Sequence, residues 1–568
     1  MPLGSALSTA LSGLNANQSA LDVIGNNLAN TNTTSFKAFR NEFVNNFYNT
    51  LGLGSAPGTA NAGTNPRQIG QGANVGSLST DFRPGSPNQT GVPSDLYIQG
   101  NGFFSVARGA EIVYTRDGSF RLNSRSELVT AQGFNVQGFG IDDNFNIQQG
   151  ALVNLTIPLG SLQVAQETSN AFLEGSLNPQ GVAATQATIV QSDPMTLLDG
   201  VTPATGATTL GNILVNGTTA MVPGGFPATL TYTPVKGNRI LPPESLTLTA
   251  GTTLQELGDF IVGSLGINTG ITQPAGNTPG FSISAGGVAS ITGNLGELSN
   301  FQIDGGDFSV SGGGIINLDF PNRAQTANGE SVFTQFSAFD SLGSAVRVNI
   351  TGYLEQLGTE FSTFRFLFDS PDQSIDPSLA GNFDNSIGSA VLTFDQRGQL
   401  QTVIGNQLTV QRDLTGAGDP LTFILDVDGV SALSVPTSQL AVVSQDGSPP
   451  GTLIDFGIDA SGVIVGAFDN GVTRNLGQIA LARFSNPQGL VAQDGNLYRQ
   501  GPNSGLPFTT TPGQGVGTIL SGALELGNVD VAVSFVQLLT ASTAFSANSR
   551  VIATTQDLFQ TLLQLPRT

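Results

Sequence analysis

The chain is 568 residues long, and at about 150 residues per domain this length predicts three to five domains. It has no Cys, His or Trp, which excludes disulfides, thiol nucleophiles, Ser-His-Asp triads and His-ligated metal sites. Only 11% of the residues are charged, yet 41 acidic against 20 basic residues leave a net charge of −21, which makes nucleic acid and anionic membranes poor partners.

The first predicted element is a helix over residues of about 4–30. Leu7, Leu14, Leu21 and Leu28 recur every seven residues, and Ile24 helps to fill the offsets of three and four residues between them. The first basic residue of the chain comes only at position 37. Because a secretory signal peptide needs basic residues ahead of its apolar stretch, we expect no cleaved signal. We also find no apolar run of about 18 residues that predicts a membrane span.

A linker is predicted over residues 36–90, because residues 49–80 are rich in Gly, Ala, Asn and Thr and have few apolar side chains. Residues 90–520 favour antiparallel strands. Val346, Val348 and Ile350 alternate with polar residues, and Asp-Gly turn signals recur along this stretch. One short segment, residues 253–262, has the pattern of an isolated helix.

The last predicted element is a helix over residues of about 527–564, ended by Pro566. Its apolar residues are again seven apart: Val531, Leu538, Phe545, Ile552 and Phe559. The polar faces of both terminal helices consist of Ser, Thr, Asn and Gln, which are mediocre helix formers. Two interpretations stay open, an intramolecular coiled-coil stalk and helices covered on both faces by neighbouring copies. Charged side chains would be costly to bury between packed copies, so the lack of charge on these faces favours the second interpretation.

Four sequence runs point to a known family. The run LDVIGNNLANTNTTSFK at residues 21–37 resembles the N-terminal signature of bacterial flagellar rod and hook proteins. The runs YTRDGSF at 114–120, GALELGNVD at 522–530 and AFSANSRVI at 544–552 resemble further signatures of that family. Ser35 stands where the family usually has Gly, which predicts a different local turn.

The resemblance implies a mixed α and β, multidomain fold with nested antiparallel β domains. The expected parts are a terminal helical assembly domain (1–35 and 525–568), the linker (36–90), an inner β domain (91–168 and 455–524), a middle β domain (169–190 and 325–454) and an outer inserted β domain (191–324). The β insertion between the two shared ends is typical of hook rather than rod proteins.

The resemblance further implies a structural subunit of the flagellar hook, a curved flexible tube that transmits torque from rod to filament. It implies no enzymatic activity and no cofactor or metal. The expected partners are other copies of the chain, the distal rod protein, the hook cap protein, the hook–filament junction protein and the flagellar type III export apparatus, with no nucleic acid and no membrane insertion. The expected location is extracellular, in the flagellum, after export without a cleaved signal.

The residues expected to carry self-assembly are Leu7, Leu14, Leu21, Ile24, Asn26, Asn27, Leu28, Asn30 and Phe36 near the start, and Val531, Leu538, Phe545, Asn548, Arg550, Ile552 and Phe559 in the last helix. The three Asn residues could be caps alone, and the resemblance favours interface contacts. A distal rod-type axial protein is the nearest alternative. An extracellular β-rich adhesin or a carboxylate-based glycosidase is a more distant one, and neither explains the uncharged helical ends.

Overall fold

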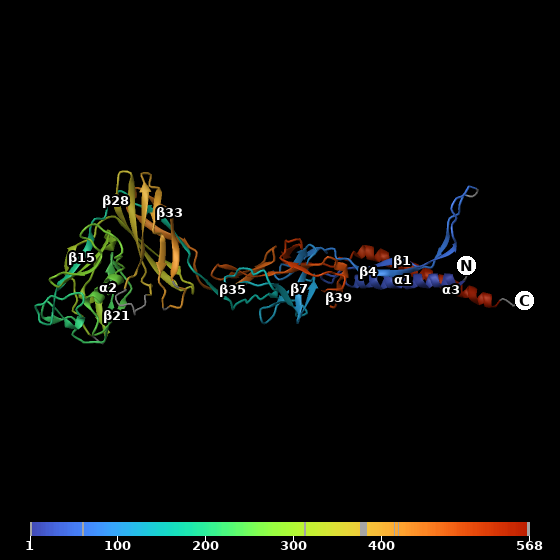
Figure 1. Ribbon diagram of the computed structural model, residues 1–568, viewed down its shortest axis with the longest axis horizontal. Helices are drawn as coiled ribbons and strands as arrows, with labels where there is room; N and C mark the ends of the chain where they lie inside the picture. Colours follow the sequence, from blue (N-terminus) through green and yellow to red (C-terminus); the bar gives the residue numbers. More distant parts are fainter. Residues whose placement is uncertain are drawn as a thin grey trace. The chain divides into compact units, whose positions relative to one another are not determined.

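The computed structural model describes residues 3–59, 62–311, 314–374, 383–413, 415–418 and 420–564 (Figure 1). Its residues cluster into two compact units. Unit 1 combines both ends of the chain, Met1–Leu162 and Thr452–Thr568, and unit 2 is the continuous stretch Gln163–Gly451. Three α-helices and many strands, mostly antiparallel, make up the described residues, so the fold is mixed α and β, as the sequence predicts.

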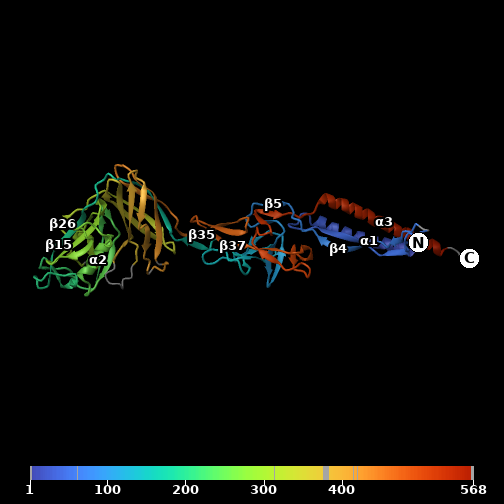
Figure 2. The same ribbon diagram turned by 45° about the horizontal axis from the view of Figure 1, so that its top comes forward.

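The two terminal helices of unit 1 lie side by side, as Figure 2 shows. They are α1 (Leu3–Ala29) and α3 (Val531–Leu563), which confirms both predicted helices. Asp530 caps the start of α3, where its side chain accepts a hydrogen bond of 3.0 Å from the backbone N–H of Val533. The predicted end of this helix at Pro566 lies outside the described residues.

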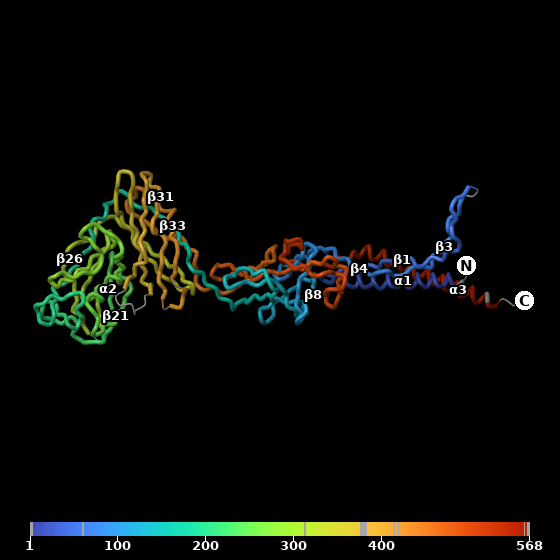
Figure 3. Tube along the Cα trace, viewed as in Figure 1, coloured from blue at the N-terminus to red at the C-terminus, as the bar shows by residue number. Residues whose placement is uncertain are grey.

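Much of the predicted linker is a long β-hairpin instead. Strand β1 (Phe39–Asn45) pairs with β4 (Ala73–Thr80), and β2 (Tyr48–Gly52) pairs with β3 (Arg67–Gly70). A further bridge joins Ser55 to Thr64. The ladder of β1 and β4 lies along α1, and the chain can be followed out and back through the hairpin in Figure 3. The linker prediction is therefore wrong for these residues, because Gly-rich composition does not prevent strands whose partners are distant in sequence.

The β body of unit 1 is one antiparallel sheet with short strands attached. Its main path runs β35 (Ser448–Ile458), β36 (Val463–Phe468), β37 (Thr473–Ile479), β11 (Asn135–Phe139), β7 (Phe103–Arg108), β8 (Glu111–Thr115), β40 (Leu497–Arg499), β39 (Val491–Gln493). The attached elements are β9 (Arg121–Leu122), β10 (Leu128–Val129), β12 (Val153–Asn154), β38 (Leu481–Arg483), β41 (Phe508–Thr510) and the 3-10 turn η5 (Pro487–Gly489).

Two strand pairs bring the end of the chain back to its beginning. β42 (Thr518–Ser521) pairs with β6 (Leu96–Gln99), and β43 (Ala523–Glu525) pairs with β5 (Pro87–Gln89). The segment that leads into α3 is thereby held beside the segments that follow α1.

The described residues of unit 2 form two large hydrophobic cores and a smaller cluster around Tyr353 and Leu367. The frame lobe, defined here as residues 163–190 and 325–451, packs two sheets on one core. The strands of these sheets are β14 (Asn170–Leu177), β27 (Ser331–Phe339), β28 (Ala345–Leu357), β29 (Phe361–Asp369), β30 (Ser386–Asp395), β31 (Leu400–Ile404), β32 (Gln407–Val410), β33 (Leu421–Ala432) and β34 (Gln439–Gln445). The short strand β13 (Gln163–Gln166) at the start of this range belongs to neither sheet. One sheet has the order β27-β28-β29-β30-β31 and the other β32-β33-β14-β34.

The insert lobe, defined here as residues 191–324, surrounds the second core and the helix α2 (Leu254–Ser264). Its other elements are β15 (Ala187–Leu197), η1 (Leu210–Asn212), β16 (Ile213–Val215), β17 (Thr219–Ala220), β18 (Ala228–Tyr232), β19 (Val235–Lys236), β20 (Arg239–Ile240), β21 (Glu244–Leu248), β22 (Gly280–Ile283), β23 (Val288–Leu295), η2 (Glu297–Ser299), β24 (Phe301–Gln302), η3 (Gly305–Asp307), β25 (Phe308–Val310) and β26 (Asn322–Gln325). A capping box of Thr253 and Glu256 starts α2, which confirms the short helix expected at residues 253–262.

Candidate functional site

The predicted self-assembly residues fall into three classes of exposure. Ile24, Asn27 and Phe36 are buried, and Asn26, Val531, Arg550 and Phe559 are exposed. The remaining residues of the set are half-buried: Leu7, Leu14, Leu21, Leu28, Asn30, Leu538, Phe545, Asn548 and Ile552. Of the predicted set, Leu21, Ile24 and Leu538 pack together between the two helices, whereas others remain partly or largely open to solvent.

The seam between α1 and α3 is narrow. Its buried core consists of Ala20, Ile24 and Ala541, with Leu21 and Leu538 packed against it. Farther along, Gly13 of α1 faces Asn548 of α3, since a Cβ at Gly13 would lie 2.9 Å from Asn548 Nδ2. Small residues thus let the helices approach closely, but few large side chains are buried between them.

The opposite side of α3 is apolar and open to solvent. Phe535, Leu539 and Leu558 lie on it, and Leu539 is 63% exposed. The hairpin carries a second open apolar surface at its far part, where Phe47 is 82% and Leu53 is 88% exposed. The stretch Val531–Thr561 is long and apolar enough to cross a membrane, which the sequence analysis did not expect. A single helix of this kind is weak support for a membrane span.

Asn27 holds the hairpin to α1. Its side-chain Nδ2 donates to the carbonyl of Phe39 at 2.7 Å, and its Oδ1 accepts from the N–H of Phe39 at 2.9 Å. Asn30 bonds instead to the backbone and side chain of Asn26, at 2.9 and 3.1 Å. The contacts of all three Asn residues described here lie within the chain, and their role between copies stays a prediction.

Three charged side chains meet where both ends of the chain join the β body. Lys37 Nζ lies 2.6 Å from Glu525 Oε1, and Arg116 Nε lies 3.3 Å from Glu525 Oε2. The side chains of Lys37 and Glu525 are 0% exposed and that of Arg116 is 2% exposed. We call these three residues the ionic junction. A buried ion pair must recover a large desolvation cost, so its geometry has to be well fixed.

The groups around the ionic junction supply that geometry. Lys37 Nζ also donates to the carbonyl of Arg83 at 2.9 Å, and the N–H of Gly85 donates to Glu525 Oε1 at 2.7 Å. Arg116 donates to the carbonyl of Gly102. Burial is the largest influence on both bases and lowers the pKa of Lys37 and the pKa of Arg116.

Ser35 and Asn528 complete the junction from the two ends of the chain. Ser35 adopts a left-handed backbone with φ of 58°, so the turn does not differ as its replacement of Gly had predicted. The structure accounts for this, because Ser35 Oγ donates to the carbonyl of Arg116 at 2.8 Å and Ser35 N donates to the carbonyl of Glu525 at 2.8 Å. Asn528 Oδ1 accepts from Ala38 N at 2.8 Å, and Asn528 N donates to the carbonyl of Phe36.

Sequence reasoning named Phe36 but missed the ionic junction. Its members stand at positions 37, 116 and 525, and no local pattern links positions so far apart. A signal was nevertheless present, because Lys37, Arg116 and Glu525 each lie in one of the family-like runs, at residues 21–37, 114–120 and 522–530.

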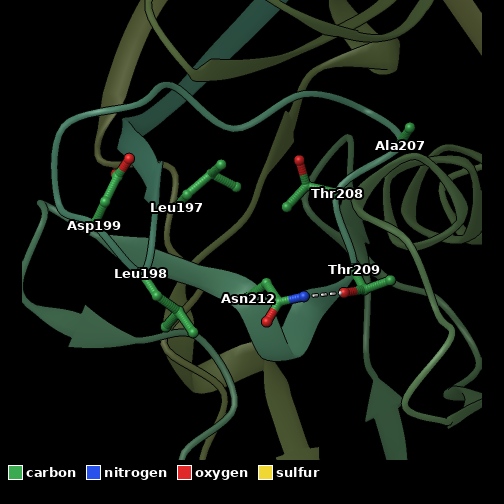
Figure 4. Close-up of a pocket in the computed structure, with 7 residues that line it drawn as sticks. All are labelled: Leu197, Leu198, Asp199, Ala207, Thr208, Thr209 and Asn212. Atoms are coloured by element: carbon green, nitrogen blue, oxygen red, sulfur yellow. Dashed lines mark hydrogen bonds between the residues drawn. The ribbon is translucent and has the colours of Figure 1, made fainter.

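A hollow in the insert lobe and the acidic residue beside it have a structural explanation. Figure 4 shows an open hollow in the insert lobe beside Asp199, in which Asn212 donates to Thr209 at 2.9 Å. Asp199 accepts hydrogen bonds from the N–H groups of Val201 and Thr202, so it closes a turn. Among the described residues no group of three or more acidic side chains is placed to hold a metal ion.

Comparison with known proteins gives three matching segments. Residues 7–37 match the flagella basal body rod protein family, residues 97–168 the flagellar hook protein FlgE/F/G D1 domain, and residues 520–565 the flagellar basal body rod FlgEFG protein C-terminal family. Each of the three segments contributes one member of the ionic junction: Lys37, Arg116 and Glu525.

Similar proteins align with the chain from end to end. The flagellar hook protein FlgE of Borreliella burgdorferi is 26% identical and that of Treponema pallidum 27% identical, each over 99% of both chains. The flagellar hook protein FlgE of Escherichia coli is 25% identical over 99% of this chain and all of its own. A crystal structure of Helicobacter pylori flagellar hook protein FlgE2 superposes with a TM-score of 0.36 at 18% identity, covering 78% of this chain and all of that one, and carries no conclusion here.

Proposed function

We infer that the chain belongs to the family of flagellar rod and hook proteins and that it is a structural subunit of the flagellar hook. The support for hook rather than rod is the end-to-end similarity to hook proteins, which includes unit 2 as well as the shared ends. In this role the chain polymerises into a curved flexible tube that transmits torque from rod to filament. The function is mechanical, and we propose no enzymatic activity for it.

The observation that carries self-assembly is the open apolar side of α3. Side chains such as Phe535 and Leu539 remain exposed although α1 already covers the other side of the helix. Burying apolar surface contributes about 25 cal/mol per Å², so a contact that covers this side stabilises an assembly. We propose that neighbouring copies cover it, and that the exposed apolar part of the hairpin, with Phe47 and Leu53, contacts neighbouring copies as well.

The low charge of the helices fits this packing. Asp22 is the single charged residue of α1, and Arg550 and Asp557 are the two of α3. Helices with few charges can be surrounded by other helices without a large desolvation cost. The predicted assembly residues in both helices, Asn26 and Arg550 included, are proposed to lie at contacts between copies.

The ionic junction gives the helix pair a fixed attachment. Lys37 follows α1, Glu525 precedes α3, and Arg116 belongs to the β body. One cluster therefore holds the segment that follows the end of α1 and the segment that precedes the start of α3 to the β body of unit 1. We propose that this attachment sets the position of the assembly helices in each subunit.

The other partners follow from the same role. A hook subunit meets the distal rod protein at one end of the tube and the hook cap protein or the hook–filament junction protein at the other. It reaches its place outside the cell through the flagellar type III export apparatus without a cleaved signal. These partners, the extracellular location and the route are proposals that rest on membership of the family.

Self-assembly is tested by electron microscopy of the purified protein. We expect tubes from the unaltered chain and none from Leu539→Asp, because a carboxylate on the exposed side of α3 would be buried on assembly. Leu506→Asp is the matched control, since Leu506 is also exposed but lies in the β body, and this variant should still form tubes. Tubes from both variants would contradict the proposed role of α3.

A deletion strain separates the hook from its nearest alternative. Loss of filaments with a complete rod supports a hook subunit. A rod that lacks its distal part would indicate the distal rod-type subunit instead, and normal filaments would exclude both.

A further inference from the structure

The insert lobe and the frame lobe of unit 2 share an apolar contact at helix α2. Phe383 of the frame lobe packs against the core of the insert lobe. Its ring lies edge-on to that of Phe260, with 5.5 Å between the ring centroids. A side chain of one lobe thus completes the core of the other.

Gly263 brings the backbones of the two lobes together at the same place. A Cβ on Gly263 would lie 1.4 Å from the carbonyl oxygen of Phe383, which no side-chain movement could relieve. Glycine is an unfavourable residue inside a helix, so its presence in the last turn of α2 calls for a reason. The close approach of the frame lobe supplies that reason.

Polar contacts surround this apolar centre. Glu244 of the insert lobe accepts a hydrogen bond of 2.6 Å from Asn385 of the frame lobe, and also one of 2.8 Å from Ser264. Asn268 donates to the carbonyl of Gly388 at 3.2 Å. At another point the guanidinium of Arg239 lies 3.3 Å from the centre of the Phe333 ring.

The two chain crossings between the lobes are themselves hydrogen-bonded strands. Strand β15, which enters the insert lobe, pairs with β26, which leaves it, with Ile189 opposite Gln325 and Val190 opposite Arg323. A paired ladder resists bending more than two separate linkers would, because a hinge would have to break its hydrogen bonds.

We propose that the insert lobe is a rigid extension of the frame lobe, held by a joint in which α2 and Glu244 contact residues 383–388. The contacts come from several separate segments and combine apolar, polar and ladder interactions, so no single linker can act as a hinge. Residues 191–324 therefore turn together with the frame lobe. If the chain is the hook subunit proposed above, the places that flex when the tube bends lie outside unit 2.

Spin labels test this directly, because the chain contains no Cys and two introduced Cys residues are labelled alone. Val201 of the insert lobe and Ile404 of the frame lobe are exposed and suit the labels. We expect one narrow distance distribution between Val201→Cys and Ile404→Cys in the full-length free chain. A broad distribution, or two populations, would overturn the proposal. The measurement needs no tubes, so its outcome is independent of whether the chain is a hook subunit.

A variant of the joint shows whether these contacts hold the lobes. Gly263→Ala should abolish the single narrow distance, because the new Cβ would collide with the carbonyl oxygen of Phe383 and separate the lobes. Alanine itself favours a helix, so a loss of helix propensity would not explain this result. Gly251→Ala is the matched control, since its Cβ would come no nearer than 3.8 Å to Thr249 Oγ1, and the narrow distance should remain. If Gly263→Ala fails to fold, Asn385→Ala removes the bond to Glu244 without adding an atom. A narrow distance in the folded joint variants would overturn the assignment of the joint.

Discussion

The ionic junction of unit 1 and the joint of unit 2 both hold distant segments of the chain together, but with different electrostatics. In the ionic junction one carboxylate, Glu525, lies between two cations at 2.6 and 3.3 Å. In the joint the carboxylate of Glu244 accepts from neutral groups, the amide of Asn385 and the hydroxyl of Ser264. The first attachment therefore brings opposite charges into direct contact, whereas the buried carboxylate of the second is held by neutral donors.

The difference has a consequence for proton binding. Burial is the largest influence on Glu244 and raises its pKa above the ordinary value of 4.5. Neutral hydrogen-bond donors offset only part of the cost of burying a carboxylate, whereas opposite charges can offset more of it. Paired charges suit an attachment that must stay fixed, and neutral partners leave a joint that responds to pH.

The largest effect should come from Glu525→Gln. This change leaves Lys37 and Arg116 buried without the carboxylate that they share, and breaking a buried pair in this way costs about 3–5 kcal/mol. The loss in the free energy of unfolding is measured by denaturant titration, with hydrogen exchange of the backbone N–H groups of unit 1 as the readout. Glu111→Gln is the control, because Glu111 pairs with Arg108 at the surface and such pairs contribute about 0–1 kcal/mol. Equal losses in the two variants would show that burial of the ionic junction has no special weight.

The terminal helices should exchange much faster than the junction to which they attach. In the free chain we expect the backbone N–H groups of α1 over residues 5–25 to exchange nearly as in unfolded chain, since their helix propensity is weak and neighbouring copies are absent. The N–H groups of Ser35 and Gly85, which donate to Glu525, should stay protected. Mass spectrometry of exchanged peptides checks this. Strong protection over residues 5–25 would contradict it.

A smaller effect is expected for the bond between α1 and the hairpin. Asn27→Ala removes both hydrogen bonds to Phe39, and at about 0.5–1.5 kcal/mol for each bond the loss is about 1–3 kcal/mol. Asn26→Ala is the matched control, because Asn26 is exposed and its side chain accepts only from Asn30. Exchange at the N–H of Phe39 should rise in the first variant and not in the second. A rise in both would point to general loosening of α1.

The smallest effect should be the response of unit 2 to mild acid. A carboxyl whose pKa is raised in the folded state stabilises that state below its ordinary pKa, 4.5 for Glu244, and this contribution is lost as the pH rises through the raised value. Glu244 faces Ser264, Asn385 and Asp369, and the pKa of Asp369 is likewise raised by burial. Unit 2 should therefore gain stability as the pH falls from 7 toward 4.5. In Glu244→Gln this gain in the stability of unit 2 should be smaller. An unchanged gain would show that other groups cause the pH dependence.

Local sequence signals predicted the helices well. The seven-residue repeats of α1 and α3 and the helical pattern of residues 253–262 in α2 involve residues within a few turns of one another. The hairpin was missed, because Phe39 pairs with Thr80 across a stretch whose composition is typical of a linker. Strand pairing depends on partners that are distant in the chain, and composition does not identify them.

The ionic junction lies beyond local sequence reasoning for a related reason. Lys37 and Glu525 are 488 positions apart, and they meet because β42 returns to β6 and β43 returns to β5. The assignment of assembly residues in α1 and α3 rests on the seven-residue repeat and on the family signatures. It concerns contacts between copies, so it is tested on assembled tubes and not on the single chain.

The 488-residue separation between Lys37 and Glu525 also has a consequence for how the chain folds. Unit 2 is continuous, and its two ends meet where Asp446 accepts from the N–H groups of Ser169 and Asn170, so it can fold without either terminus. Closing a loop becomes cheaper as the loop shortens, and a folded unit 2 shortens the one between Lys37 and Glu525. Once unit 2 has folded, unit 1 therefore closes over a shorter effective loop, whichever end of the chain emerges first.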